Sequence, residues 1–249
     1  MQRRTAFTLI ELIVVIGIIS LLLALLWPGI RAAKEAPRRM TCQNHLKQIA
    51  IGCHNYHITH GSFPSAYAIN EEERPLYSWR VNILPFIEQQ KLYDIFHLDE
   101  SWDSGHNQAL FENRSVIYAC PQQYRFEGQP GDCPYGMIVG PNTISSGPNA
   151  VTISKVTDGL ANTIIVAETR KNIPWPSPTD ISFASLAMGV LKRNDSRALE
   201  DGISSRHRKE ETAVVFADGS VRMLSSKIKP EILQALATIN GGEKVDGEW

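Results

Sequence analysis

An apolar run near the start of the chain, residues 7–27, constrains the fold more than any other feature, and it contains one charged residue, Glu11. As a helix rising about 1.5 Å per residue, this run covers about the 30 Å of a bilayer's hydrocarbon core. We therefore expect residues 7–27 to form a transmembrane helix. A carboxylate within such a helix costs roughly 2.5 to 3.5 kcal/mol on insertion scales, so Glu11 requires a compensating partner. The run itself contains no basic residue that could serve.

Two general interpretations of this run leave Glu11 unexplained. A secretory signal has a basic start, a short apolar region and a small-residue cleavage site. Arg3 and Arg4 fit the basic start, but the apolar run is too long for a signal peptide. A plain membrane anchor explains the length of the run and gives its carboxylate no purpose.

A third interpretation uses the whole segment from Arg3 to Glu11, RRTAFTLIE. This segment resembles the leader of type IV pilins and type II secretion pseudopilins. The resemblance implies that residues 1–6 are a leader peptide, that a prepilin peptidase cleaves after Ala6, and that the new amine of Phe7 is N-methylated. Ala6 stands where these leaders usually carry Gly, and because Ala is also small we expect slower processing at most.

The same resemblance implies a role for Glu11 in subunit assembly. When such helices pack into a filament, the Glu11 carboxylate of an incoming subunit can be offset by the α-ammonium group of Phe7 in a neighbour. Either charge alone is costly to bury. We expect this pairing to fix the axial register between subunits.

The rest of the chain is long enough for one soluble head. The chain has 249 residues and a formal net charge of −1; about 190 residues remain after the helix, which is sufficient for a hydrophobic core. Near-neutral charge argues against a nucleic-acid partner, because binding to phosphates requires a basic surface. Basic residues after the apolar run favour a cytoplasmic head, but the leader motif carries more information. We therefore expect a single-pass inner-membrane protein with an extracytoplasmic head.

The four cysteines allow more than one pairing in that compartment. Cys42 and Cys53 lie about 16 Å apart along one expected helix and cannot pair with each other. Cys120 and Cys133 flank a loop rich in Pro and Gly, and a disulfide closing it would contribute roughly 3 kcal/mol. A disulfide between Cys42 and Cys120, joining the helix to the head, is the other serious option. Four reduced thiols are the third.

Apolar spacing predicts that the N-terminal helix continues to residue 61. The apolar face narrows after residue 27 to a stripe with spacings of four, three, four and three, and Gly61 follows as a stop signal. Pro28 and Pro37 should kink or interrupt this helix over 7–61. The residues of the stripe are Cys42, Leu46, Ile49, Cys53 and Tyr56.

The head, residues 62–249, has the mixed patterns of an α+β fold. Residues 82–96 and 230–239 have helical spacing, and residues 157–169 contain an Asp-Gly turn followed by a strand. Residues 212–225 predict a hairpin at Asp218-Gly219, the pair that type I′ turns prefer. Residues 121–150 and 172–180 hold much of the Pro and Gly and are expected to be loops. The predicted fold is pilin-like, with a long helix packed on a mainly antiparallel sheet and short helices.

The chain also resembles the DUF1559 family of pilin-like proteins over nearly its whole length. Its C-terminal signature, a His spaced before an Asp-Gly, departs here from the usual form: ten residues rather than nine separate His207 from Asp218, and Arg-Lys-Glu replaces Pro-Gly-Gly. The family is of unknown biochemical function, so the resemblance implies fold and location rather than activity. The similar segments are MTCQNHLKQ at 40–48, HNYH at 54–57, GSFP at 61–64, LPFIEQ at 84–89, ACP at 119–121, DG with NTI at 158–164 and FADGSV at 216–221.

Two groups of side chains have the composition of metal sites. His54, His57 and His60, with His45 earlier, repeat at a spacing that allows two of them to share Zn or Ni, but we expect them to be surface or packing residues. The acidic stretch of Asp94, Asp99, Glu100 and Asp103 suggests structural Ca²⁺, yet its spacing matches no EF-hand loop. We expect a solvated loop there and no cofactor.

Two further groups bear on activity. Ser204, Ser205, His207, Asp218 and Glu168 supply the residue types of a hydrolase triad, but no nucleophile-elbow motif accompanies them, and we expect no enzyme. Trp79, Trp102 and Trp175 either form a sugar- or peptide-binding surface or anchor the core and loops.

The sequence therefore predicts a prepilin-like subunit that assembles through its N-terminal helix into a pilus or a type II secretion pseudopilus. Its expected partners are a prepilin peptidase, like subunits, the membrane and an assembly platform driven by a cytoplasmic ATPase. After assembly we expect a periplasmic or cell-surface filament. The alternative is a membrane-anchored or filament-displayed binding module for a glycan or a surface protein.

Overall fold

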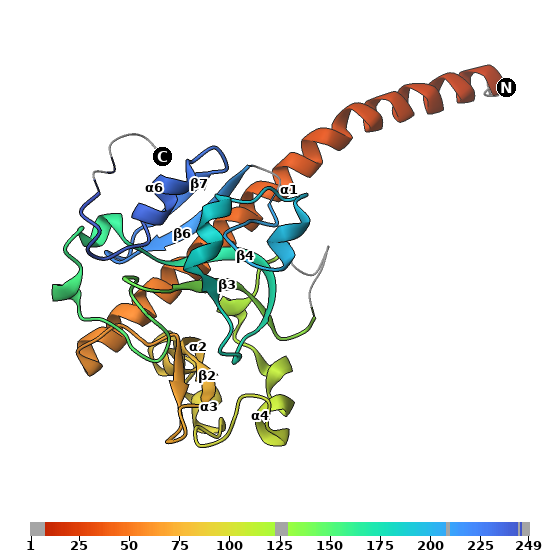
Figure 1. Ribbon diagram of the computed structural model, residues 1–249. Helices are drawn as coiled ribbons and strands as arrows, with labels where there is room; N and C mark the ends of the chain where they lie inside the picture. Colours follow the sequence, from red (N-terminus) through yellow and green to blue (C-terminus); the bar gives the residue numbers. More distant parts are fainter. Residues whose placement is uncertain (1–7, 123–128, 208–209, 244, 246–249) are drawn as a thin grey trace. The chain divides into compact units, whose positions relative to one another are not determined.

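The computed structural model describes residues 8–122, 129–207, 210–243 and 245, with side chains described for all of these except 28–33. The chain divides into two compact units, Met1–Arg39 and Met40–Trp249. Helix α1, Leu9–His60, begins in the first unit and ends in the second (Figure 1).

Helix α1 ends where the sequence predicts. Gly61 follows it with φ +78°, and its N–H donates to the carbonyl of His57 at 2.8 Å. This is the left-handed C-terminal conformation that glycine adopts without strain. The helix is continuous through Pro28 and Pro37, so neither residue interrupts it. A proline removes one hydrogen bond within a helix, and the bonds around it can maintain the helical path.

A five-stranded sheet in the order β5-β3-β4-β6-β7 forms the centre of the head (Figure 1). Its neighbouring strands are antiparallel except for β3 and β5, which are parallel. The predicted α+β class with a mainly antiparallel sheet is thus confirmed. The strands are β3, Asp132–Val139; β4, Ile164–Pro174; β5, Ile181–Ser182; β6, Glu211–Phe216; and β7, Val221–Ser225. A separate pair consists of β1, Tyr67–Ile69, and β2, Pro75–Ser78.

Each face of the five-stranded sheet packs against its own core. Along β6, Ala213 and Val215 belong to a core that includes Leu46 and Ile49 of α1. Val214 and Phe216 belong to the other core, which the short helices near residues 183–188 and 230–235 cover. Alternate strand residues point to opposite faces, so the apolar run 213–216 of β6 reflects burial on both faces.

The remaining helices are short. The helix predicted over 82–96 is split in two by Glu88, which has φ 61°. The helix predicted over 230–239 is shorter than expected and starts at a proline, as the first helical turn permits. The α-helices are α2, Trp79–Asn82; α3, Gln90–Asp94; α4, Gly105–Ala109; and α6, Pro230–Ala235. The 3₁₀ helices are η1, Leu84–Ile87; η2, Phe111–Asn113; η3, Val116–Tyr118; η4, Ile153–Lys155; η5, Leu160–Asn162; η6, Phe183–Met188; and η7, Ser196–Leu199.

The β6–β7 hairpin is confirmed, but its turn type differs from the prediction. A type I′ turn needs positive φ at both central residues, whereas of Asp218 and Gly219 only Gly219, at +80°, has it. Gly219 N donates to the carbonyl of Phe216, and Phe216 N donates to that of Ser220, both at 2.9 Å. The loop is therefore a three-residue connection with glycine in the left-handed position.

Strand β3 lies within the segment 121–150 that was expected to be a loop, and that expectation is wrong for residues 132–139. The strand accommodates Pro134 because its register with β4 shifts between Cys133 and Tyr135. It needs Gly136 because a Cβ there would lie 2.7 Å from the Ile181 side chain of β5. The Pro and Gly that predicted a loop thus mark an irregularity and a close approach within a buried strand.

Candidate functional sites

Thr8 and Glu11 form a reciprocal cap at the start of α1. The Glu11 Oε2 atom accepts hydrogen bonds from the Thr8 backbone N–H at 2.8 Å and from the Thr8 hydroxyl at 2.7 Å. Thr8 Oγ1 accepts from the Glu11 N–H at 3.4 Å. This is a capping box, with Thr at the N-cap and Glu at the third helical position. The Thr-x-x-Glu spacing is visible in the sequence, although we did not predict the cap from it.

The apolar helix that follows is exposed in this single chain. Leu9–Trp27 has a mean hydropathy of 3.0 and none of its residues is buried. By length and composition this segment can cross a membrane. The predicted processing residues Ala6 and Phe7 lie outside the described residues.

A second candidate site is a buried polar cluster in the head, where Cys42 of α1 meets Cys120. Their sulfur atoms are 2.9 Å apart, and the two residues are only 1% and 3% exposed. His207 Nε2 lies 3.8 Å from the Cys120 sulfur and 3.9 Å from Glu168 Oε1. Tyr135 stands opposite Glu168 in the β3–β4 register and is also buried. Five ionisable side chains from separate segments therefore meet in the core.

Burial and mutual contacts shift the acidities of this cluster. Burial raises the pKa of Glu168 to about 7. A hydrogen bond from Cys42 lowers the pKa of Cys120, and His207 lowers it further. Conversely, the hydrogen bond to Cys120, together with burial, raises the pKa of Cys42. Cys120 is therefore the better thiolate of the pair and Cys42 the hydrogen-bond donor.

The cluster offers two kinds of chemistry at the sulfur atoms. Cys42, Cys120 and His207 place one ligand atom each within 4.8 Å of the others, and thiolates with imidazole suit zinc. Alternatively, the two sulfurs bond to each other. Cys133, the third residue predicted for a disulfide, is buried on β3, where its thiol donates to the carbonyl of Tyr135 at 3.5 Å.

The predicted triad residues meet only in part. Ser205 joins His207 and Glu168: its Oγ accepts from the His207 N–H at 3.2 Å, and its side chain hydrogen-bonds Glu168. Ser204 Oγ accepts from Arg170 N at 2.9 Å, and Asp218 accepts from Ser220 N within the β6–β7 turn. His207 and Glu168 do come together, but beside Cys120. Sequence reasoning missed this grouping, although both His207 and the Ala-Cys-Pro segment around Cys120 were noted in the DUF1559 resemblance.

The helix histidines have packing contacts, as expected. His45 Nδ1 lies 2.8 Å from the Ala119 carbonyl, and His57 Nε2 accepts from Ile153 N at 3.3 Å. His60 stacks on Tyr56 with ring centroids 4.0 Å apart. They hold the end of α1 against the head rather than converging on a common point.

The acidic stretch makes separate local contacts. Asp94 accepts from Gln90 at 2.7 Å, Glu100 pairs with His97 at 2.9 Å, and Asp103 accepts from Ser101. These contacts are what a solvated loop is expected to make.

The tryptophans separate into core and surface residues. Trp79 and Trp175 are fully buried, so the interpretation of these two as part of a binding surface is wrong. Trp79 donates through its Nε1 to Asp180, which explains why a polar-edged ring is tolerated there. Trp102 is half-buried and stacks on Phe111 at 5.5 Å. The aromatic surface proposed for a displayed binding module is thereby reduced to one partly exposed ring.

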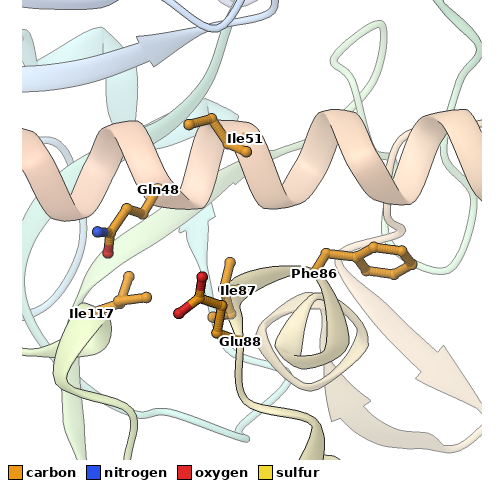
Figure 2. Close-up of a pocket in the computed structure, with 6 residues that line it drawn as sticks. All are labelled: Gln48, Ile51, Phe86, Ile87, Glu88 and Ile117. Atoms are coloured by element: carbon orange, nitrogen blue, oxygen red, sulfur yellow. The ribbon is translucent and has the colours of Figure 1, made fainter.

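The head has a shallow pocket of about 230 Å³ beside α1. Figure 2 shows the Glu88 carboxylate directed toward the helix and Gln48 on the helix above Ile117. Glu88 and Gln48 are exposed, so the pocket has polar groups at an open entrance. Its lining residues are Gln48, Ile51, Phe86, Ile87, Glu88 and Ile117.

Comparison with protein families agrees with both parts of the chain. A model described as the prokaryotic N-terminal methylation motif matches residues 1–27. A second model, described as a protein of unknown function (DUF1559), matches residues 31–150. The chain therefore matches a prepilin-like protein. Searches of curated proteins and of solved structures give no match.

The family matches bear differently on the two candidate sites, the start of α1 and the cysteine cluster. The families found are pilin-like and structural rather than enzymatic. The methylation motif implies processing by a prepilin peptidase and assembly with pilin-like subunits. With the apolar helix, it fits a membrane-anchored protein. These matches therefore bear on the start of α1, and they assign no role to the cysteine cluster.

Proposed function

We propose that this protein is a pilin or pseudopilin subunit that is cleaved after Ala6 and assembled through α1 into a type IV pilus or a type II secretion pseudopilus. One observation carries the proposal: within the methylation motif matched over residues 1–27, the exposed apolar segment Leu9–Trp27 has a single acidic residue, in its first turn. An exposed helix of this length must be covered by lipid or by other helices.

Glu11 has a different partner at each stage of this proposal. In the single chain it caps its own helix through Thr8. In a filament core, its carboxylate requires a cation, since an unpaired buried charge is costly. The α-ammonium group that cleavage creates at Phe7 of a neighbouring subunit supplies that cation. Cleavage and assembly are linked in this way, because an uncleaved chain has a peptide bond where the charge is needed.

The proposal also sets the location and partners. The subunit sits in the inner membrane as a single-pass protein with its head outside the cytoplasm. It then moves from the membrane into the filament, which requires an assembly platform and a cytoplasmic ATPase. Like subunits provide the helical contacts that replace lipid around Leu9–Trp27.

Mass spectrometry of the mature N-terminus from native membranes tests the proposal directly. The expected chain starts at N-methylated Phe7. An intact Met1 start would mean a plain anchor with a displayed head, and a start beyond Ala32 would mean an ordinary secreted protein. In the same cells, a Glu11→Ala variant should insert into the membrane and be processed, but should be missing from sheared filaments or from crosslinked subunit ladders.

A further inference from the structure

The two buried sulfurs of the head come from segments far apart in the sequence. Cys42 and Cys120 are separated by 78 positions, yet their Sγ atoms are 2.9 Å apart. Cys42 lies on the part of α1 that packs in the head core, one turn before Leu46 of that core. Cys120 follows η3 in a loop. A covalent bond between them would join α1 to the head at a point where the two already touch.

The distance between the sulfurs favours a bond over a shared metal ion. Zinc binds each thiolate at about 2.3 Å in a tetrahedron, which separates two sulfur ligands by roughly 3.8 Å. The observed 2.9 Å is well inside that separation and nearer to the 2.03–2.05 Å of a disulfide. His207, at 3.8 Å from the Cys120 sulfur, packs beside the pair.

The surroundings also favour this pairing over the alternative between Cys120 and Cys133. Cys133 is fully buried on β3, and its thiol points to the Tyr135 carbonyl. The Cys120 sulfur is within contact of Cys42 and His207 instead. Cys53 is also fully buried, in the core that includes Leu46. It lies further along α1, at a distance from Cys42 that no disulfide can span.

We propose that Cys42 and Cys120 form a disulfide that ties the head-packed part of α1 to the loop after η3. The proposal rests on the extracytoplasmic location of the head in the proposed function, since disulfides persist in oxidising compartments. In the proposed assembly the subunit is held through α1, so a pull on the head acts on the contact between head and helix. The disulfide makes that contact covalent.

The bond forms by two exchange steps with an extracytoplasmic protein that carries an oxidised dithiol. The Cys120 thiolate attacks one sulfur of the oxidant's disulfide, forming a mixed disulfide and releasing the oxidant's other sulfur as a thiolate. The Cys42 sulfur, after losing its proton, attacks Cys120 and releases the second thiolate. Two cysteine thiols are oxidised, one oxidant disulfide is reduced to a dithiol, and the two protons lost by Cys120 and Cys42 go, through solvent, to the two released thiolates. Because both sulfurs are buried, the exchange must precede the final packing of α1.

Peptide mapping of the full-length protein from native membranes tests the pairing. The sample is alkylated under denaturing conditions, digested, and compared with and without prior reduction. We expect one linked peptide pair containing Cys42 and Cys120, with Cys53 and Cys133 alkylated without reduction. Alkylation of all four thiols, a pair containing Cys133, or stoichiometric zinc with all four thiols alkylated would each overturn the proposal.

The same sample separates this proposal from the proposed function. An N-methyl-Phe7 start with four free thiols overturns the disulfide alone, and an intact Met1 start with the linked pair overturns prepilin processing alone. In a Cys42→Ser variant, the linked peptide should disappear and Cys120 should become fully alkylated without reduction. The matched control is Cys53→Ser, on the same helix, which should keep the linked pair. If Cys42→Ser does not accumulate, the wild-type map still decides the question.

Discussion

The Glu11 carboxylate and Thr8 are joined by reciprocal hydrogen bonds, with Oε2 accepting from the Thr8 nitrogen at 2.8 Å and from its hydroxyl at 2.7 Å. The residue that we propose as an assembly group thus also caps the first turn of its own helix. These two roles use different properties of the side chain. Capping requires a hydrogen-bond acceptor, whereas pairing with an amine in a filament core requires a negative charge.

Replacing Glu11 by Gln separates these roles. Gln at the third helical position preserves a capping box but has no charge for the neighbouring Phe7 amine. We expect Glu11→Gln to be inserted and cleaved normally, yet to be lost from filaments as completely as Glu11→Ala. Immunoblots of membrane and sheared-filament fractions measure both steps.

The control for capping is Thr8→Ala, which keeps the charge and removes the N-cap oxygen, at a cost of about 1 kcal/mol in helix stability. It should reduce filament incorporation far less than Glu11→Gln does. Normal incorporation of Glu11→Gln would contradict the charge-pairing role and leave Glu11 as a capping residue only.

The proposed Cys42–Cys120 disulfide predicts a large contribution to stability. It would close a loop of 78 residues, for which chain-entropy arguments give about 4.5 kcal/mol. We expect reduction to lower the unfolding free energy of the detergent-solubilised protein by about that amount, measured in denaturant with and without a thiol reductant. The Cys53→Ser variant should show the same sensitivity to reductant. The same unfolding midpoint with and without the reductant would count against the disulfide.

A buried ion pair in the head predicts a second large effect. Arg80 donates to Asp180 Oδ1 at 2.7 Å with both side chains almost completely buried. The same oxygen accepts from Trp79 Nε1 and Met137 N. Removing one partner leaves an uncompensated buried charge, so Asp180→Asn should destabilise the head by about 3–5 kcal/mol.

The matched control for this ion pair is the exposed pair between Arg74 and Glu72, 2.9 Å apart. Because solvent screens it, Glu72→Gln should change stability by less than about 1 kcal/mol. Chemical denaturation of both variants measures the difference. Equal effects of the two substitutions would mean that burial does not increase the contribution of the Arg80–Asp180 pair to the stability of the head.

The stability of the head should depend on pH through Glu168. Burial raises its pKa to about 7 from an ordinary 4.5, beside His207 and Cys120 and with Oε2 accepting from Ala213 N. Because the folded protein holds this proton more tightly than the unfolded chain, the contribution is fully present below pH 4.5 and is lost as pH rises through 7. The loss is on the order of 3 kcal/mol.

Glu168→Gln isolates this contribution because it keeps the shape of the side chain and does not titrate. The stability of wild type relative to Glu168→Gln should fall between pH 4 and pH 8, as measured by denaturant unfolding at each pH. A constant difference across that range would show that Glu168 titrates normally in the folded protein.

The parts of the fold that the sequence predicts are those determined by local patterns. The end of α1 follows from Gly61, and the β6–β7 hairpin follows from two apolar runs around Asp218-Gly219. Strand β3 was missed because its Pro and Gly are accommodated only by partners distant in sequence, namely the shifted register with β4 and the approach of Ile181.

The cysteine cluster was predicted only in part. The sequence limited the pairings of Cys42 to a short set, but no local pattern indicates that His207 and Glu168 lie beside Cys120. That grouping depends on how α1, β4 and two loops pack together, which spacing along the chain does not encode.

The β6–β7 turn provides the last prediction, because Gly219 is constrained in two ways. Its φ of +80° disfavours any residue with a Cβ, and a Cβ there would lie 3.3 Å from His54 Nε2 of α1. Gly61 has a similar φ of +78°, but a Cβ added there would meet no atom within 4 Å. Replacing Gly61 by Ala therefore measures the cost of backbone strain alone. We expect Gly61→Ala to cost about 1–2 kcal/mol and Gly219→Ala to cost more, by the displacement of His54 and of the Lys47 hydrogen bond to the Gly219 carbonyl at 2.7 Å. Denaturant unfolding of both variants measures the two costs. Equal costs would mean that the hairpin tip and α1 separate easily.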